Sequence, residues 1–209
     1  MYGLHRALQS FVLKVATLSD ERLEELSSIR SFTDRLKFCN KHWEKLGAGS
    51  SRVVFDYNAD SVLKLAKNKK GLEQNAVECD GFLQNYDVIP ELREEDSSER
   101  WIVVEKVQKA TESDFQSILG ISWEDYCTYM RYQDERRSKN PKNPFEDKPE
   151  FKEKLDNDEF IGEIVDILVN FDMKVGDLIR ISSYGKKNNK LKLIDAGLTK
   201  QVYDDYYKK

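Results

Sequence analysis

The sequence predicts an α+β protein built as two lobes. Helical patterns dominate both ends of the 209-residue chain, and short β-type runs lie between them. This length suffices for one domain or for two small lobes around a ligand cleft. We expect a helical N-terminal extension over 1–45, a lobe of antiparallel sheet plus one helix over 46–107, and a reduced helical lobe over 108–209.

The N-terminal extension is expected to contain three helices. Apolar residues recur at helical spacing over 3–17, which predicts an amphipathic helix there. A second helix is expected from Ser19 to Ile29 and a third from Thr33 to Trp43. These segments carry no catalytic pattern, so packing is their expected role.

The middle of the chain changes to β-type patterns. Strands are expected over 52–57 and 61–66, joined by the turn Asn58-Ala59-Asp60 as a hairpin. A helix with Leu72, Ala76, Val77 and Phe82 on one side is expected over 71–85. A polar turn over 94–99 then precedes a strand over 101–107.

The last hundred residues are predicted to be mainly helical, around one late strand. The apolar stripe from Phe160 to Phe171 gives the strongest helical pattern in the chain. The expected elements are helices over 113–119, 122–133, 157–172 and 199–207, a charged loop over 136–144, and a strand over 190–193.

Composition excludes several classes of protein. The net charge is −4 with acidic and basic residues interspersed, whereas a nucleic-acid-binding domain is usually basic. No apolar run approaches the ~18 residues of a membrane span, and Arg6 and Gln9 interrupt any secretory signal. We therefore expect a cytoplasmic protein with neither a membrane nor a nucleic-acid partner.

The cysteines and histidines do not indicate a metal centre or a disulfide framework. Cys39, Cys79 and Cys127 are odd in number and widely spaced, which fits a reducing compartment. His5 and His42 lack metal-ligand spacing.

A glycine-rich segment, Gly47-Ala48-Gly49-Ser50-Ser51, lies between a predicted helix end and a predicted strand. Glycines let a backbone approach phosphate closely and present N–H donors to it. No helix follows directly, so this is neither a Rossmann turn nor a Walker loop. An ordinary hairpin turn is the alternative interpretation.

Lys64 and Glu78 are candidates for an internal ion pair. Leu63 and Leu65 point to one face of the predicted strand, so Lys64 points to the other, under the glycine loop. Glu78 follows on the next predicted helix and could hold the ammonium in place. Lys67 and Glu73 are the competing candidates, and a lysine or glutamate facing water is the plain alternative.

Two aspartates mark the late part of the chain. Asp195-Ala196-Gly197 ends a predicted strand, where a carboxylate suits Mg²⁺ on nucleotide phosphates. Asp177 lies 18 positions earlier, a natural separation for a catalytic base and a metal ligand joined by a small hairpin. The end of the strand over 101–107 could give backbone hydrogen bonds to an adenine, although a buried core strand is equally compatible with it.

Taken in order, these motifs resemble the protein-kinase-like superfamily over about residues 46–199. Gly47 and Gly49 resemble its glycine-rich loop, Val62-Leu63-Lys64 its lysine strand, and Gly176-Asp177-Leu178 its catalytic loop. Glu78 resembles the partner glutamate of that lysine. Asp195-Ala196-Gly197 resembles the Asp-Phe-Gly motif, and Glu105–Val107 resembles the hinge. More narrowly, the pattern is similar to small kinase-like proteins carried by bacteriophages and bacteria, which implies the cytoplasm of a bacterial or phage-infected cell.

The resemblance implies a bilobal kinase-like fold and phosphoryl transfer from ATP with Mg²⁺ to an unknown hydroxyl of a small molecule or a protein. It implies that Gly47, Gly49, Ser50, Ser51, Lys64, Glu105 and Val107 bind the nucleotide. It also implies Lys64, Glu78 and Asp177 as catalytic residues, and Asp195 and Ser182 as metal ligands.

Several positions depart from the family pattern. Ser182 replaces the asparagine that holds a second Mg²⁺, Ile179 replaces a lysine, and Ala196 replaces the phenylalanine. Only 12 residues follow Gly197, so we expect no activation segment and no platform for a protein substrate. A pseudokinase that acts as an interaction module is the main alternative. Nucleotidyl transfer and a phage structural or host-takeover role are the others.

Overall fold

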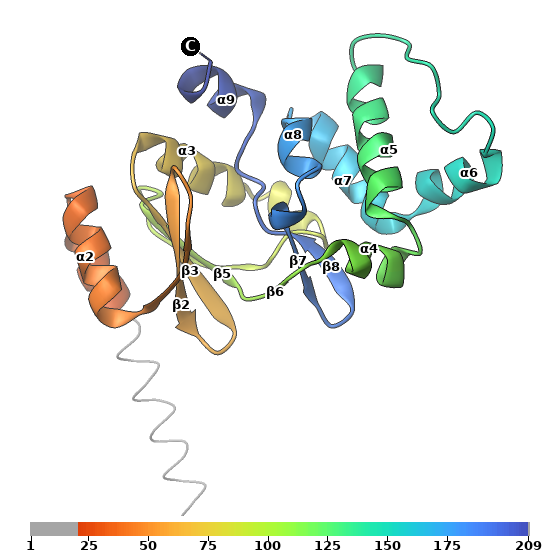
Figure 1. Ribbon diagram of the computed structural model, residues 1–209. Helices are drawn as coiled ribbons and strands as arrows, with labels where there is room; N and C mark the ends of the chain where they lie inside the picture. The colour runs from red at the N-terminus through yellow and green to blue at the C-terminus, as the bar shows by residue number, and fades with distance from the viewer. Residues whose placement is uncertain (1–20, 209) are drawn as a thin grey trace, which may run out of the picture.

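The computed structural model describes residues 21–208, in which a sheet region and a helical region lie side by side (Figure 1). The sheet region comprises residues 21–78 and 92–105, and the helical region comprises 83–89 and 106–208. The structure confirms the predicted α+β class, with antiparallel sheets and helices. The helix expected over 3–17, and the start of the next one, lie outside the described residues.

The sheet region is built on five antiparallel strands in the order β1-β2-β3-β5-β4. Their bounds are β1 Glu44–Ala48, β2 Arg52–Asn58, β3 Ser61–Ala66, β4 Leu92–Glu95 and β5 Trp101–Glu105. The hairpin of β2 and β3 lies where the alternating pattern predicts it. Strands β1 and β4 were not predicted: the segment before the glycine loop was taken as a helix end, and Glu94 and Glu95 as part of a turn.

One face of this sheet is covered by helical residues 21–28 and by α2 (Phe32–His42). Val53, Phe55, Leu63 and Leu65 point to this side and are buried against Leu26 and its neighbours, forming one hydrophobic core. Because side chains alternate along a strand, Arg52, Val54 and Lys64 point to the opposite face.

Helix α3 (Lys69–Glu78) packs on that opposite face and is shorter than predicted. The sequence pattern indicated one helix over 71–85, but α3 ends at Glu78 and a separate 3₁₀ turn, η1, covers Leu83–Asn85. The Asp80 carboxylate accepts hydrogen bonds from the N–H groups of Phe82 and Leu83, at 2.8 and 3.2 Å. An aspartate that caps a new turn in this way competes with helix continuation.

The face of α3 that is buried also differs from the prediction. Ala76 is exposed and Phe82 is 80% exposed, whereas Gln74, Asn75 and Glu78 are buried. Hydrophobic periodicity identifies the inner face of a helix only when that face is apolar. Here the inner face is polar, which indicates that it serves a site rather than a core.

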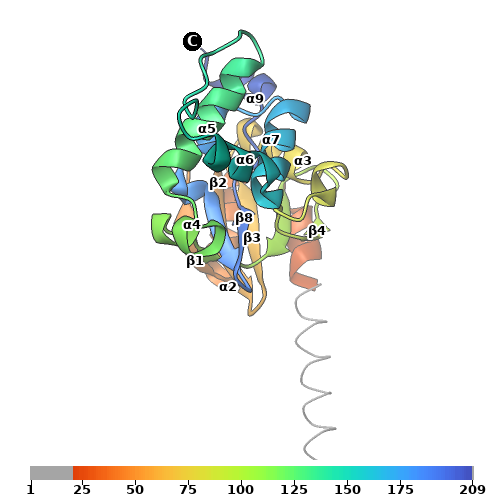
Figure 2. The ribbon, with the colours of Figure 1, turned by 90° about the vertical axis from the view of Figure 1, so that its right-hand side faces the viewer.

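The helical region contains a small three-stranded sheet in the order β6-β7-β8 and most of the helices. Its strands are β6 Gln108–Lys109, β7 Tyr184–Lys187 and β8 Lys190–Leu193, and its helices are α4 Glu112–Leu119, α5 Trp123–Arg136, α6 Pro149–Asn157, α7 Glu159–Asn170, α8 Val175–Leu178 and α9 Lys200–Tyr206, with the 3₁₀ turn η2 Ile181–Ser183. Helix α6 was not predicted, because its nine residues bury only Leu155. Figure 2 views the molecule from the end that carries α5 and α6.

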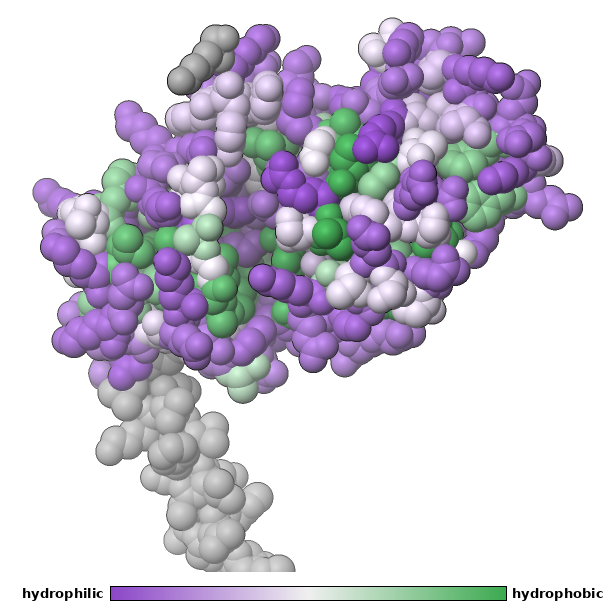
Figure 3. Space-filling view, in the orientation of Figure 1, coloured by the Kyte–Doolittle hydropathy of each residue, from purple (hydrophilic) through white to green (hydrophobic). Residues whose placement is uncertain are grey.

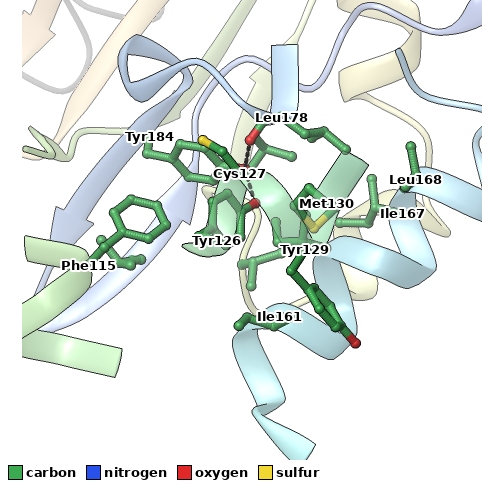
Figure 4. Close-up of a cluster of buried hydrophobic side chains, with 14 of the residues drawn as sticks. Phe115, Tyr126, Cys127, Tyr129, Met130, Ile161, Ile167, Leu168, Leu178 and Tyr184 are labelled. Atoms are coloured by element: carbon green, nitrogen blue, oxygen red, sulfur yellow. Dashed lines mark hydrogen bonds between the residues drawn. The ribbon is translucent and has the colours of Figure 1, made fainter. Parts of the chain in front are cut away.

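A second hydrophobic core holds the helical region together (Figure 4). Tyr184 donates a 2.8 Å hydrogen bond to the carbonyl of Leu178, so the hydroxyl of Tyr126 is the donor in the 2.5 Å bond between the two tyrosines. This buried chain ties α5 and β7 to the residue that follows Asp177. Helix α8, which carries Asp177, is therefore anchored to the hydrophobic core.

The surface is strongly polar. The face seen in Figure 3 is dominated by hydrophilic side chains, with apolar ones in small groups. Within residues 21–208, no helix is both long and apolar enough to cross a membrane. All three cysteines are free thiols.

Candidate functional site

A cavity of about 450 Å³ lies between the glycine loop, α3 and the loops that follow α8 and β8. Polar side chains from both regions converge on it. Its lining includes Gly49, Ser50, Ser51, Arg52, Lys64, Gln74, Asp177, Arg180, Ser182, Asp195, Tyr203 and Tyr207.

The glycine loop connects β1 to β2 and is held by the start of α3. The N–H of Gly49 donates to the carbonyl of Arg52 at 2.9 Å, which closes the turn. Lys67 donates to the carbonyl of Gly49 at 2.8 Å, and Lys70 donates to the Ser50 hydroxyl at 2.9 Å. Lys67, the competing candidate for the site lysine, therefore binds the outside of the loop.

The predicted loop residues divide into two groups. Gly49, Ser50 and Ser51 line the cavity, and the buried Ser51 hydroxyl donates to the side-chain oxygen of Gln74. Gly47 instead lies within β1, opposite Val54, and is not part of the lining. The segment is thus a strand–loop–strand turn, with β1 before it where a helix end was expected.

Gly71 allows α3 to approach this loop closely. A Cβ atom at this position would lie 2.4 Å from the carbonyl oxygen of Ser51 and about 3.0 Å from the backbone of Ala66. Any side chain would force the helix away from the loop and the strand. Asn68 caps the helix by accepting the N–H of Gly71 at 3.1 Å, which fixes where it starts.

Lys64 and Glu78 form a buried ion pair. Their side chains are 8% and 6% exposed, and Lys64 Nζ lies 2.5 Å from Glu78 Oε2. Lys64 also donates to the carbonyl of Ile194 at 2.7 Å, the residue directly before Asp195. The structure thus brings Lys64, Glu78 and the Asp195 backbone together, while the competing candidate Glu73 is exposed.

Arg52 is the site residue that the sequence analysis missed. It is 8% exposed, and its two terminal nitrogens each lie 2.7 Å from a carboxylate oxygen, one of Glu78 and one of Asp195. Its strand register carried a usable signal: Val54 lies opposite Lys64, and Arg52, two residues earlier, points to the same face.

The charges of this cluster outweigh the effect of burial. Burial would raise the pKa of Glu78, but the positive charges of Arg52 and Lys64 hold it below its usual value. Burial would likewise lower the pKa of Arg52, but Glu78 and Asp195 raise it above its usual value. Glu78 and Arg52 are therefore ionised near neutral pH.

Asp177 lies on the opposite wall of the cavity, within α8. It is 7% exposed, and Arg180 Nη1 lies 3.3 Å from its carboxylate. Burial raises the pKa of Asp177, and repulsion from Asp195 raises it further, while Arg180 and Arg52 act in the opposite sense. A partly desolvated carboxylate with a raised pKa is suited to accept a proton.

The oxygen donors of the cavity suit one magnesium ion that arrives with a nucleotide. Mg²⁺ is commonly bound through one or two carboxylates plus substrate phosphates and waters. Asp195 is 43% exposed at the side chain, and one of its oxygens contacts Arg52. Ser182 offers only an exposed hydroxyl. Among residues 21–208, no group of three or more His, Cys, Asp or Glu side chains is arranged to hold a metal ion.

Glu105 and Val107, which were predicted to bind the nucleotide, lie outside the lining of this cavity. The N–H of Glu105 donates to the carbonyl of Glu91 at 2.8 Å, and its carboxylate pairs with Lys187 at 2.8 Å. Val107 lines a separate groove and packs so closely on β7 that a Cβ on Gly185 would lie 2.3 Å from its side chain. The backbone N–H of Glu105 and the side chain of Val107 are thus engaged within the protein.

The C-terminal helix α9 supplies an aromatic wall that the sequence analysis also missed. Tyr203 and Tyr207 line the cavity, with parallel rings 5.8 Å apart. Lys70 lies 4.1 Å from the Tyr207 ring centroid, and Lys174 lies 4.5 Å from that of Tyr203. Because Lys70 belongs to α3 and Lys174 precedes α8, this stack connects the two regions beside the cavity.

Comparisons with known proteins give little beyond the structure itself. No protein-family model matches the sequence, and a search of curated proteins gives no match either. Among solved structures, the chain is similar to the streptomycin–ATP–APH(2")-IIa ternary complex, with 16% sequence identity and a TM-score of 0.35. That alignment covers 81% of this chain and 71% of the other. A likeness of this degree does not assign an activity.

Proposed function

We propose that this protein is a kinase-like phosphotransferase that transfers a phosphoryl group from ATP to a hydroxyl acceptor. The observation that carries the proposal is the buried ion pair of Lys64 and Glu78, packed on the backbone directly before Asp195. Isolated buried ion pairs are costly to form, so one lining a cavity is better explained by function than by stability.

The proposed role of each residue follows from its position in the cavity. The loop of Gly49, Ser50 and Ser51 would cover the phosphates, and Lys64, fixed by Glu78, would contact them. Asp177, with its raised pKa, would orient the acceptor hydroxyl and take its proton. Phosphoryl transfer depends mostly on such positioning and on charge stabilisation.

A magnesium ion carried by the nucleotide would be held by Asp195, with the Ser182 hydroxyl nearby. Such an ion neutralises charge on the phosphates. One oxygen of the Asp195 carboxylate contacts Arg52. The ion would therefore use the other oxygen or share the first one with Arg52. The neutral Ser182 is a weak ligand, so the donor set favours a single ion over two.

A nucleotide-binding module without catalysis is the second candidate. Two observations favour it: Arg52 already contacts the Asp195 carboxylate, and Ser182 offers no charge to a second ion. Both candidates require nucleotide to occupy the same cavity. They differ in whether a phosphoryl group is then transferred to an acceptor.

Binding is tested first, by thermal unfolding with ATP and Mg²⁺. A ligand at one hundred times its Kd stabilises by about 2.7 kcal/mol, which corresponds to roughly 5–11 °C for a chain of this size. Lys64→Met is expected to abolish the shift, whereas Lys45→Met, on the exposed strand β1, keeps it. No shift of the unmodified protein at millimolar ATP, with or without Mg²⁺, would overturn the proposal.

Transfer is tested next with ATP labelled at either the γ- or the α-phosphate. Label from the γ-phosphate on water, on a small polyol or on added protein supports the kinase activity. Label from the α-phosphate supports nucleotidyl transfer instead, and binding without transfer supports the non-catalytic module.

A further inference from the structure

Arg52 is a charged side chain enclosed where a nucleotide's phosphates would lie. It begins β2, directly after the glycine loop, and lines the cavity with only 8% of its surface exposed. Its guanidinium reaches Glu78 on α3 and Asp195 on the loop after β8, each at 2.7 Å. It also donates to the side-chain oxygen of Asn75 at 3.4 Å.

The geometry fixes this cation beside Lys64. Arg52 and Lys64 are on the same face of the β2–β3 hairpin, and both contact the carboxylate of Glu78, one at each oxygen. Arg52 also contacts Asp195, so the two cations of this cluster are shared between two carboxylates. A guanidinium, with five donors in a planar fork, has N–H groups available for a phosphate in addition to its carboxylate partners.

The charge of a nucleotide indicates what this enclosed guanidinium could bind. Nucleotide phosphates carry several negative charges, and kinases commonly neutralise them with two divalent ions. Here the second ion lacks a charged ligand, since Ser182 is neutral and exposed. Arg52 instead occupies an oxygen of Asp195, the carboxylate that would otherwise serve a metal alone.

We propose that Arg52 is a nucleotide-binding residue that takes the place of a second metal ion, so that the phosphate chain binds even without divalent cations. This inference rests on the proposed nucleotide site but is independent of catalysis. It adds a residue to the site and sets its metal requirement: one ion assists binding and is not required for it.

The test is calorimetric titration of the full chain with ADP and with ATP, in excess Mg²⁺ and in EDTA. For the unmodified protein we expect the Kd in EDTA to lie within about tenfold of that in Mg²⁺. Losing charge-assisted hydrogen bonds weakens binding by about 10- to 150-fold, so Arg52→Gln should lose that much affinity in EDTA. In Mg²⁺ the loss should be smaller, because the ion then binds the free Asp195.

Arg93→Gln is the matched control, since Arg93 lies on the edge strand β4 and pairs with the exposed Glu91 at 3.5 Å. Its affinities should equal those of the unmodified protein in both conditions. Arg52→Lys keeps the charge but not the fork, and should be weakened less than Arg52→Gln in EDTA. It provides the same comparison if Arg52→Gln does not fold.

Three results separate the inference from the function on which it rests. If the unmodified protein binds nucleotide in Mg²⁺ but loses more than about 100-fold in EDTA, the role of Arg52 is refuted while the nucleotide site stands. Equal affinities of Arg52→Gln and the unmodified protein in EDTA refute it as well. If no nucleotide binds in either condition, the proposed function itself fails.

Discussion

Replacing Glu78 by glutamine tests whether the buried cluster is ionised as its geometry implies. The substitution keeps the shape of the side chain but removes the charge that both buried cations contact; Arg52 then keeps its contact with Asp195, and Lys64 loses its carboxylate partner. Removing one partner of a buried ion pair costs about 3–5 kcal/mol. The glutamine oxygen can still accept from Lys64, so we expect the lower end, about 3 kcal/mol.

The assay is urea unfolding at 25 °C. A loss of about 3 kcal/mol is a large part of the roughly 5–15 kcal/mol of a typical domain and lowers the midpoint of thermal unfolding by roughly 6–12 °C. Glu91→Gln is the matched control, because the Glu91 side chain is 69% exposed and its contact with Arg93 is 3.5 Å. A surface pair of that kind contributes at most about 1 kcal/mol.

The pH dependence of the difference adds a second criterion. The folded-state pKa of Glu78 is lowered, so its charge contributes stability that is present above the unfolded value of 4.5 and is lost as pH falls. The cost of Glu78→Gln should therefore shrink below about pH 4.5. A cost under about 1 kcal/mol at pH 7, or one that does not change with pH, would refute the ionised cluster.

Three further outcomes follow from the same geometry. Asp177→Asn should lower the rate of phosphoryl transfer by about 10²–10⁴-fold. Its nucleotide affinity, measured by calorimetry, should stay within about threefold of that of the unmodified protein. An unchanged rate would exclude Asp177 as the base. Because the folded-state pKa of Asp177 is raised, its ionisation costs stability once pH rises above the unfolded value of 3.8. The Asp177→Asn variant should therefore have a higher urea midpoint of unfolding than the unmodified protein at pH 7. A lower midpoint would contradict the raised pKa. Gly71→Ala places a Cβ 2.4 Å from the Ser51 carbonyl and should cost about 1–3 kcal/mol in urea unfolding, whereas Gly81→Ala, with open space around it, should not; equal effects would show that α3 can move away from the loop.

The sequence predicts those parts of the site that depend on short-range geometry. A lysine flanked by two leucines in a strand must point away from the hydrophobic core that the leucines enter. Lys64 therefore faces the cavity, and the first helix after it carries Glu78. The spacing of Asp177 and Asp195 likewise accommodates the hairpin of β7 and β8.

The missed parts depend on contacts between distant segments. Arg52 meets Asp195 from 143 positions away, and neither residue alone indicates the other. The inner face of α3 was assigned to apolar residues because periodicity assumes an apolar core, yet this face is Gln74, Asn75 and Glu78. Glu105 and Val107 were placed by analogy, and they lie outside the lining of the cavity.

Apolar packing and polar contacts have different tasks in this molecule. Each region has a hydrophobic core of its own, and Val77 of α3 also packs against the core of the helical region. At the cavity, what joins the halves is polar or backbone: Arg52 with Asp195, Lys64 with the carbonyl of Ile194, and Gly197 against Gln74, where a Cβ would lie 2.8 Å from its side chain. The strength of a hydrogen bond depends on its angle, whereas apolar burial has no preferred direction. Polar contacts therefore define the relative position of the two regions more sharply than apolar burial does. The alignment of the two regions and the geometry of the proposed phosphate site are therefore set by the same few atoms. A phosphate bound to the remaining N–H groups of Arg52, beside Asp195, would therefore bridge the same two regions.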